Sequence, residues 1–181
     1  MELLDFPIVR QSTPDTCSCA CVQACLCYYG LDYRDDEIRK FMDIGNGVKE
    51  VHPSKIVEAL QHFGKLKAKY KKLTLDNIKV CINRHQPVIL NLQAWYKSAK
   101  PNLSLDNDGH YAVAVGYDSI DQSSCIIFSD PASFYKTYLS GDELERRWHD
   151  GDKADWDYDH MGIIVYGRKP VYKSGVIIKM E

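Results

Sequence analysis

The sequence lacks several features that would assign it to a broad class. No stretch of its 181 residues approaches the roughly 20 apolar residues that span a bilayer. Residues 1–7 have neither the basic start nor the apolar core of a secretory signal. A formal net charge of −2 gives no electrostatic reason to expect nucleic acid or an anionic membrane as a partner. These absences predict a cytoplasmic protein that stays in solution.

Internal repeats and low-complexity linkers are also absent. The chain is long enough for one sizeable hydrophobic core and too short for two comfortable ones. Its 45% hydrophobic and 27% charged residues are ordinary for a globular protein. We therefore expect residues 1–181 to form a single domain.

Cysteine, by contrast, is plentiful: there are seven, and five of them lie within residues 17–27. Cysteines spaced along one helix are poorly placed for disulfides with one another. We interpret Cys19, Cys21, Cys25 and Cys27 as small apolar core residues. The alternative is a soft-metal site for Zn or Cu(I), or a redox module. Against the metal site, cysteines at these helical spacings cannot all face one ion, and no Cys-x2-Cys pair is present.

Hydrophobic periodicity divides the chain into a helical half and a strand-rich half. Helices are predicted at about residues 17–29, 32–42, 53–63, 74–84 and 140–148. Strands are predicted at residues 65–72, 87–95, 110–118, 125–130, 162–166 and 176–180. The first is predicted to be an edge strand with its lysines on a solvated face. Long loops are expected at residues 96–109 and 150–159. Within the second loop, residues 155–159 could mimic a calcium loop but lack its spaced glycine and terminal glutamate. The pattern indicates an α+β fold.

The first predicted helix is the most unusual element of the sequence. Turn and cap residues precede it, and it begins at Cys17 and ends before Gly30, a residue suited to a left-handed helix cap. Nearly every position between is small or apolar, which predicts a helix buried on all sides. Cys17 then lies at the helix N-terminus, where unpaired N–H groups favour an anion. A thiolate, the nucleophilic form of cysteine, is favoured there.

Gln11 lies six positions before Cys17, upstream of the turn. From there its side-chain NH2 can point at the same space as the Cys17 backbone N–H. Two donors that converge beside a nucleophile are the parts of an oxyanion hole.

A thiolate that transfers acyl groups also needs a base that returns a proton to the leaving group. His110 is the best candidate, because it begins a valine-rich strand directly after Asp108-Gly109. The next predicted strand ends at Asp130, and if the two strands form an antiparallel hairpin, Asp130 returns beside His110. It can then orient the imidazole and stabilise the imidazolium. Asp108 is an alternative orienting acid, but no strand fixes its direction.

These motifs together resemble the C39-like branch of the papain-like cysteine peptidases. The shared features, in order, are Gln11, a short turn, Cys17 and a helix ending in Tyr-Gly. They continue with His110-Tyr before a strand that ends in Gly-Tyr, and then Asp130-Pro. Like freestanding relatives, which have no ABC transporter, the chain also has Leu-Ser before a helix that ends in Arg-Trp, here residues 139–148. One departure is Ser18, where the family usually has glycine; it affects the expected substrate, not the reaction.

The resemblance implies a papain-like fold in which a central N-terminal helix packs on a twisted antiparallel sheet. It implies Cys17 as nucleophile, His110 as general base and acid, Asp130 as orienting residue and Gln11 as oxyanion donor. The expected reaction is hydrolysis of a peptide or isopeptide bond in a peptide or protein substrate, without a cofactor. Relatives that cleave double-glycine leader peptides are fused to a transporter, so that substrate does not carry over.

Three other functions remain open from the sequence. The same residues could use an amine instead of water, as in an acyltransferase or transpeptidase such as the phytochelatin synthases. The cysteine cluster could form a metal or redox module, and a peptide-binding pseudoenzyme is the fourth reading. The remaining histidines are interpreted as surface or structural residues: His52, His62, His85, His149 and His160.

Overall fold

The computed structural model describes residues 1–45, 51–93, 109–120, 123–149, 159–177 and 179–180. Its helices are α1 (Cys17–Tyr28), α2 (Asp35–Met42), α3 (Pro53–Gly64), α4 (Leu75–Asn83) and α5 (Gly141–Arg147). Its strands are β1 (Glu2–Leu3), β2 (Lys67–Lys72), β3 (Val88–Gln93), β4 (Gly109–Ile120), β5 (Ser123–Ser129), β6 (Lys136–Ser140) and β7 (Met161–Tyr166). Helices therefore dominate the first half of the described chain and strands the second.

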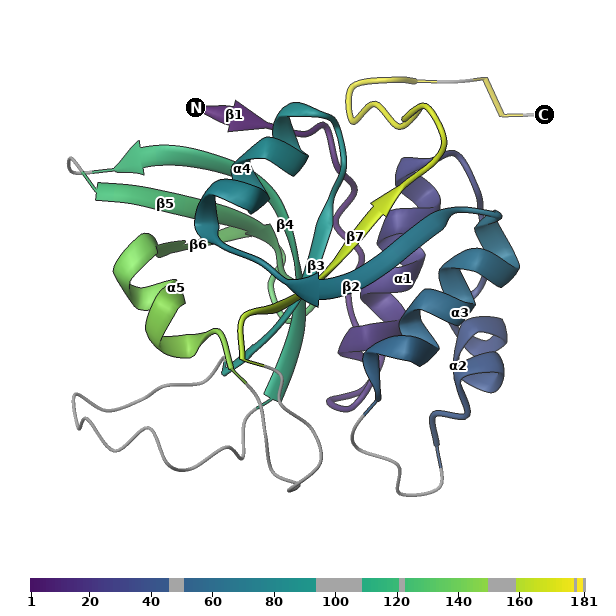
Figure 1. Ribbon diagram of the computed structural model, residues 1–181. Helices are drawn as coiled ribbons and strands as arrows, with labels where there is room; N and C mark the ends of the chain where they lie inside the picture. The colour runs from purple at the N-terminus through teal and green to yellow at the C-terminus, as the bar shows by residue number, and fades with distance from the viewer. Residues whose placement is uncertain (46–50, 94–108, 121–122, 150–158, 178, 181) are drawn as a thin grey trace.

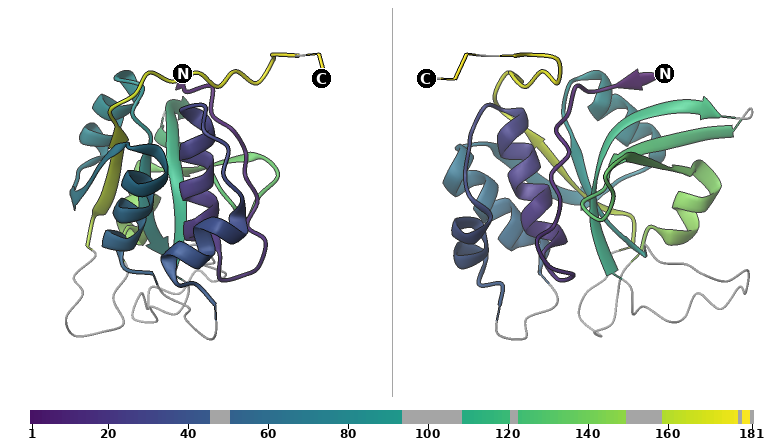
Figure 2. Two further views of the ribbon diagram at one scale, coloured as in Figure 1. Left: turned by 90° about the vertical axis from the view of Figure 1, so that its right-hand side faces the viewer. Right: turned by 180° about the vertical axis from the view of Figure 1, so that it is seen from behind.

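The strands form one sheet in the order β2-β7-β3-β4-β5-β6, with β1 paired to β4 (Figure 1). Every pairing is antiparallel. The views in Figures 1 and 2 show α1, α2 and α3 in one half of the molecule, and α4 and α5 beside the strands in the other. The N-terminal end of α1 and the first residues of β4 lie at the same end of the molecule, away from both chain termini.

Helix α1 is buried as its composition predicts, and it packs against α2, α3 and β4. Two hydrogen bonds fix it to the sheet: the Cys21 thiol donates to Tyr111 O at 3.3 Å, and the Tyr29 hydroxyl donates to Val165 O at 2.9 Å. The helix ends where Gly30 adopts φ +78°. A Cβ at this position would lie 2.3 Å from Val171 Cγ2, so both the backbone conformation and the space favour glycine.

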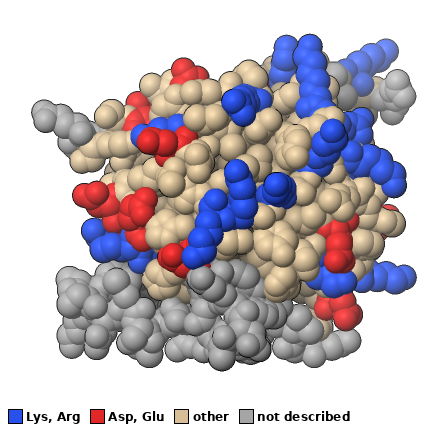
Figure 3. All heavy atoms as spheres, in the orientation of Figure 1, with Lys and Arg blue, Asp and Glu red and all other residues tan. Residues whose placement is uncertain are grey.

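Strand β2 forms one edge of the sheet, as its alternating lysines predict. Lys67, Lys69 and Lys71 are exposed, and basic side chains form a diagonal band across the face that β2 occupies (Figure 3). Charged side chains on an edge strand discourage pairing with another chain. The lysine-rich segment therefore has a structural explanation in its place at the edge.

The structure confirms an α+β fold with a central helix on an antiparallel sheet and corrects two predicted elements. The expected strand at residues 176–180 is wrong: residues 176, 177, 179 and 180 are not in a strand, and Ile177 is 97% exposed. Its β-branched residues fit a strand, but among the strands that the structure describes none pairs with it. Strand β6 was not predicted; it pairs with β5 as the opposite edge of the sheet. The predicted loops at 96–109 and 150–159 lie almost wholly outside the described residues.

Candidate active site

The turn before α1 is held by side-chain hydrogen bonds. Thr16, which is only 1% exposed, donates from its hydroxyl to Thr13 O at 3.0 Å and accepts from Thr13 N–H at 3.0 Å. The Ser12 hydroxyl donates to Asp35 Oδ2 at 2.8 Å and thereby joins the turn to α2. These contacts fix the backbone from which α1 starts, and Cys17 is the first residue of that helix.

Cys17 itself is partly exposed, unlike its neighbours in α1. Its backbone N–H has no hydrogen-bond acceptor among the residues that the structure describes. A free donor at a helix N-terminus, next to the sulfur, is what the sequence predicted for one half of an oxyanion hole.

His110 and Asp130 come together through the predicted hairpin. Strands β4 and β5 pair antiparallel, with Val113 opposite Ser129, and Asp130 follows β5 directly. His110 Nε2 lies 2.8 Å from Asp130 Oδ1, and His110 is only 4% exposed. Asp130 Oδ1 also accepts the Ala132 N–H at 2.8 Å, which fixes the carboxylate. Asp108, the alternative acid, lies outside the described residues.

The imidazole of His110 also makes a hydrogen bond with the Cys17 side chain. Because Nε2 faces Asp130, Nδ1 is the ring nitrogen left for the sulfur. The structure thus brings a thiol, an imidazole and a carboxylate from three separate segments together.

The charges of the three groups support one another. Burial by itself lowers the pKa of His110, but hydrogen bonds with Asp130 and Cys17 and the negative charge of both groups outweigh it and raise that pKa to about 9. Burial alone would raise the pKa of Asp130. Hydrogen bonds from His110 and Ala132 N–H, with the positive charges of His110 and Arg10, lower it instead. At neutral pH the pair is therefore an imidazolium facing a carboxylate.

Gln11 is next to the site but does not present its amide as expected. Its side-chain nitrogen donates to Thr13 O and Pro14 O, both at 3.0 Å. Its buried Oε1 has no hydrogen-bond partner in the part of the chain that the structure describes. Both amide hydrogens are thus directed at the carbonyls of its own turn. Its backbone N–H donates to Pro131 O at 3.1 Å, which joins it to the segment after Asp130.

The other cysteines of α1 lie in a different environment. Burial, the largest cause in each case, raises the pKa of Cys19 to about 12 and the pKa values of Cys21, Cys25 and Cys27 above the ordinary range. Thiols of this kind are poor nucleophiles and poor metal ligands at neutral pH. In the described parts of the chain, no three His, Cys, Asp or Glu side chains are grouped so that they could hold a metal ion.

Ser18, the residue in place of the family's usual glycine, is 1% exposed. Its hydroxyl has no hydrogen-bond partner among the described residues. The sequence marked this position as unusual but did not show that the hydroxyl would be buried.

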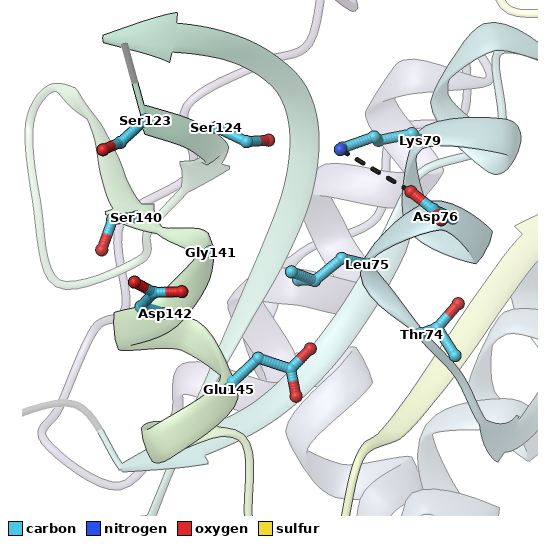
Figure 4. Close-up of a pocket in the computed structure, with 10 residues that line it drawn as sticks. All are labelled: Thr74, Leu75, Asp76, Lys79, Ser123, Ser124, Ser140, Gly141, Asp142 and Glu145. Atoms are coloured by element: carbon cyan, nitrogen blue, oxygen red, sulfur yellow. Dashed lines mark ion pairs between the residues drawn. The ribbon is translucent and has the colours of Figure 1, made fainter. Parts of the chain in front are cut away.

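A cavity of about 450 Å³ lies elsewhere, between the first turn of α4 and the segments of β5, β6 and α5 (Figure 4). Hydroxyl and carboxylate side chains form much of its lining, among them those of Thr74, Ser124 and Glu145. Asp76 and Lys79 form an ion pair of 3.7 Å on its wall. None of the four predicted site residues lines this cavity. We therefore take the Cys17 thiol and the His110 imidazole, and not this cavity, as the centre of the candidate active site.

Comparison with known families shows which family the chain belongs to. A sequence model described as the Peptidase_C39-like family matches residues 3–154, most of the chain and all four predicted site residues. The chain belongs to the Peptidase_C39-like family. A search of curated protein sequences finds no match.

Solved structures of C39 peptidases share the fold. A C39-like peptidase structure from Bacillus anthracis superposes with a TM-score of 0.68 at 14% identity and covers 93% of this chain and 98% of the other. The peptidase domain of Streptococcus ComA, a bifunctional ABC transporter of a quorum-sensing pathway, gives 0.59 at 17% identity, with coverage of 88% and 97%. A double-glycine-motif protease from an AMS/PCAT transporter, in complex with its leader peptide, gives 0.60 at 15% identity and 92% coverage of both chains. At these identities the likeness shows the papain-like fold of the family.

The fold also bears on the membrane prediction. No helix in the described part of this C39-like chain is long and apolar enough to cross a bilayer.

Proposed function

We propose that this C39-like protein is a cysteine peptidase that hydrolyses a peptide or isopeptide bond. The observation that carries the proposal is that His110 forms hydrogen bonds with both Asp130 and Cys17. That one of the similar structures holds a leader peptide supports a peptide as the substrate class. A protonated His110 and the N–H groups at the start of α1 both stabilise a thiolate at Cys17.

The reaction follows from this arrangement. The Cys17 thiolate attacks the substrate carbonyl carbon, and the carbonyl electrons move to oxygen. The His110 imidazolium gives its proton to the leaving amine, the C–N bond breaks, and a thioester remains on Cys17. The now neutral His110 takes a proton from water, the hydroxide attacks the thioester, and the acid product leaves as the thiolate is restored. Asp130 keeps the imidazole oriented and stabilises its positive form throughout.

Two groups are assigned to the oxyanion. The Cys17 N–H is available without rearrangement. Gln11 has to redirect one amide hydrogen from the carbonyl of its turn to the oxyanion. This exchange is favourable in principle, because hydrogen bonds to ionised acceptors are about twice as strong as neutral ones. Catalytic hydrogen bonds often reach their final geometry only in the complex with substrate.

Selective alkylation tests the activated thiol. One equivalent of iodoacetamide at pH 7 should modify Cys17 before any other cysteine, as read by peptide mass spectrometry. The buried thiols react slowly because burial raises their pKa. Cys81→Ala is the matched control, since it removes a buried thiol of α4 and leaves the labelling of Cys17 unchanged. Equal labelling of all seven cysteines, or none at Cys17, would contradict the proposal.

Cleavage of a peptide library tests the reaction itself. Wild-type protein should cleave peptides and Cys17→Ala should not, with products read by mass. Adding a primary amine separates hydrolysis from acyl transfer, since a transferase yields the amine adduct and a hydrolase the free acid. Gln11→Ala should lower kcat by about 100-fold with little change in KM, the result expected for loss of an oxyanion donor. An unchanged kcat would remove Gln11 from the oxyanion hole.

A further inference from the structure

An exposed aromatic pair follows Asp130 closely in the chain. Phe134 and Tyr135 are 71% and 80% exposed, while the strand before Asp130 ends in the buried core. Exposed aromatic side chains mark an interaction surface only where they form part of a patch with other groups, so their neighbours decide their role. No step of the proposed reaction uses these two rings.

Hydrogen bonds join the segment of the two rings to the proposed catalytic residues. Ala132 donates its N–H to Asp130, and Pro131 O accepts the N–H of Gln11. Phe134 is two residues beyond Ala132, a reach of at most about 7 Å of extended chain. The rings therefore belong to the same hydrogen-bonded segment that positions the carboxylate, within five residues of Asp130 in the chain.

Arg10 completes this surface from the other side. Its guanidinium carbon lies 4.1 Å from the centre of the Phe134 ring, a cation–π distance, and its Nη1 donates to Ala132 O at 2.8 Å. No carboxylate of the described chain lies within ion-pair distance of Arg10. The three residues Arg10, Phe134 and Tyr135, which we name the aromatic ledge, thus combine two exposed rings with a cation that is held by a backbone carbonyl and forms no ion pair within the described residues.

We propose that the aromatic ledge binds substrate residues beside the scissile bond and selects peptides with a large apolar or aromatic residue next to an acidic one. This inference rests on the proposed peptidase function. The rings provide apolar contact area for the first residue, and Arg10 provides a charge for the second. Because Arg10 already bonds to Ala132, it is held in place before the substrate arrives.

Cleavage profiling tests the ledge. A proteome-derived peptide library is digested with wild-type protein, with Phe134→Ala/Tyr135→Ala and with Arg10→Gln. Wild-type cleavage sites should be enriched in an aromatic or large apolar residue beside Asp or Glu. For one cleaved peptide, the double variant should have a kcat/KM about 10-fold below that of the wild type. When serine replaces the aromatic residue of that peptide, the two proteins should differ little in kcat/KM.

The test of Arg10 compares the cleavage rates of two peptides by the same protein. This comparison cancels any general change in activity that arises because the charge of Arg10 also acts on Asp130. In the wild type a peptide with Glu should be cleaved about 2- to 5-fold faster than its Gln analogue, and in Arg10→Gln the two rates should be equal. Tyr70→Ala, which removes a 42% exposed ring from β2, is the matched control and should keep the wild-type preferences.

Three outcomes overturn the inference, and they are distinguishable. If iodoacetamide does not label Cys17 first in the wild type, the peptidase proposal fails, and the ledge proposal fails with it. If Cys17 is labelled and peptides are cleaved but the variants keep wild-type preferences, the ledge alone is wrong. If sedimentation shows a wild-type dimer that the double variant abolishes while the preferences persist, the ledge is a self-association surface.

Discussion

Two histidines of this protein lie against carboxylates at nearly the same distance, yet only one lies next to a nucleophile. His110 Nε2 is 2.8 Å from Asp130, whereas His160 is 2.7 Å from Glu145 through Nε2 and 2.6 Å from Asp159 through Nδ1. Both pKa values are raised because carboxylate hydrogen bonds outweigh burial. By charge alone the two sites look alike.

The difference lies in the second ring nitrogen. Both nitrogens of His160 face carboxylates, and its ring packs against Trp148 at a centroid distance of 5.2 Å. His110 gives one nitrogen to a carboxylate and the other to a thiol. A histidine with a raised pKa is therefore a candidate acid and base only where one nitrogen faces a reacting group.

Substitution of either catalytic side chain separates the two sites most strongly. Cys17→Ala and His110→Ala should each lower kcat/KM at least about 1,000-fold, because nucleophile and base act as a unit. His160→Ala should stay within twofold of wild type. A large loss of kcat/KM in His160→Ala, with an unchanged melting temperature, would contradict the distinction between the two histidines.

Replacing the carboxylate of the catalytic pair should have the next largest effect. Asp130→Asn should lower kcat about 100-fold, since an amide still accepts a hydrogen bond but no longer stabilises the imidazolium by charge. Glu145→Gln, the matching change beside His160, should leave kcat unchanged. Equal effects of the two substitutions, measured with one cleaved peptide, would contradict the distinction.

The pH dependence should report the same pair. His110 is protonated below its pKa of about 9, so kcat/KM should fall as the pH rises through about 9 and the general acid is lost. In Asp130→Asn this alkaline limb should move to lower pH, because a source of the raised pKa is gone. An alkaline limb that stays at the same pH in the variant would assign it to another group.

The smallest expected effect is the change in protein stability when His160 loses its contacts with Glu145 and Asp159. Since the pKa of His160 is raised by folding, its contribution is fully present below the unfolded value and is lost as the pH rises through the folded value. Because solvent screens these partly exposed charges, His160→Ala should lower the melting temperature by only about 1–3 °C at pH 6, the equivalent of less than about 1 kcal/mol. At pH 10 the difference should nearly vanish. A difference that is the same at both pH values would indicate lost packing against Trp148 instead.

Much of the site could be predicted from the sequence because its parts are local. Helix α1 begins at Cys17 and ends before Gly30 as the turn residues and glycine indicate. The pairing of β4 and β5 places Asp130 beside His110, since only two residues separate these strands in the sequence. The prediction of a strand at residues 176–180 is wrong because it used only the local pattern of these residues. A strand also needs a partner strand, which is distant in the sequence.

The sequence by itself determined the buried helix with a cysteine at its N-terminus, the hairpin that pairs His110 with Asp130, and the edge strand of lysines. Each follows from spacing within a short segment. Only the tertiary structure decided that the imidazole faces the Cys17 sulfur, that the Gln11 amide points into its own turn, and that Arg10 lies on Phe134. These contacts join segments that are far apart in the chain or depend on competing acceptors, and local propensity contains no information about either.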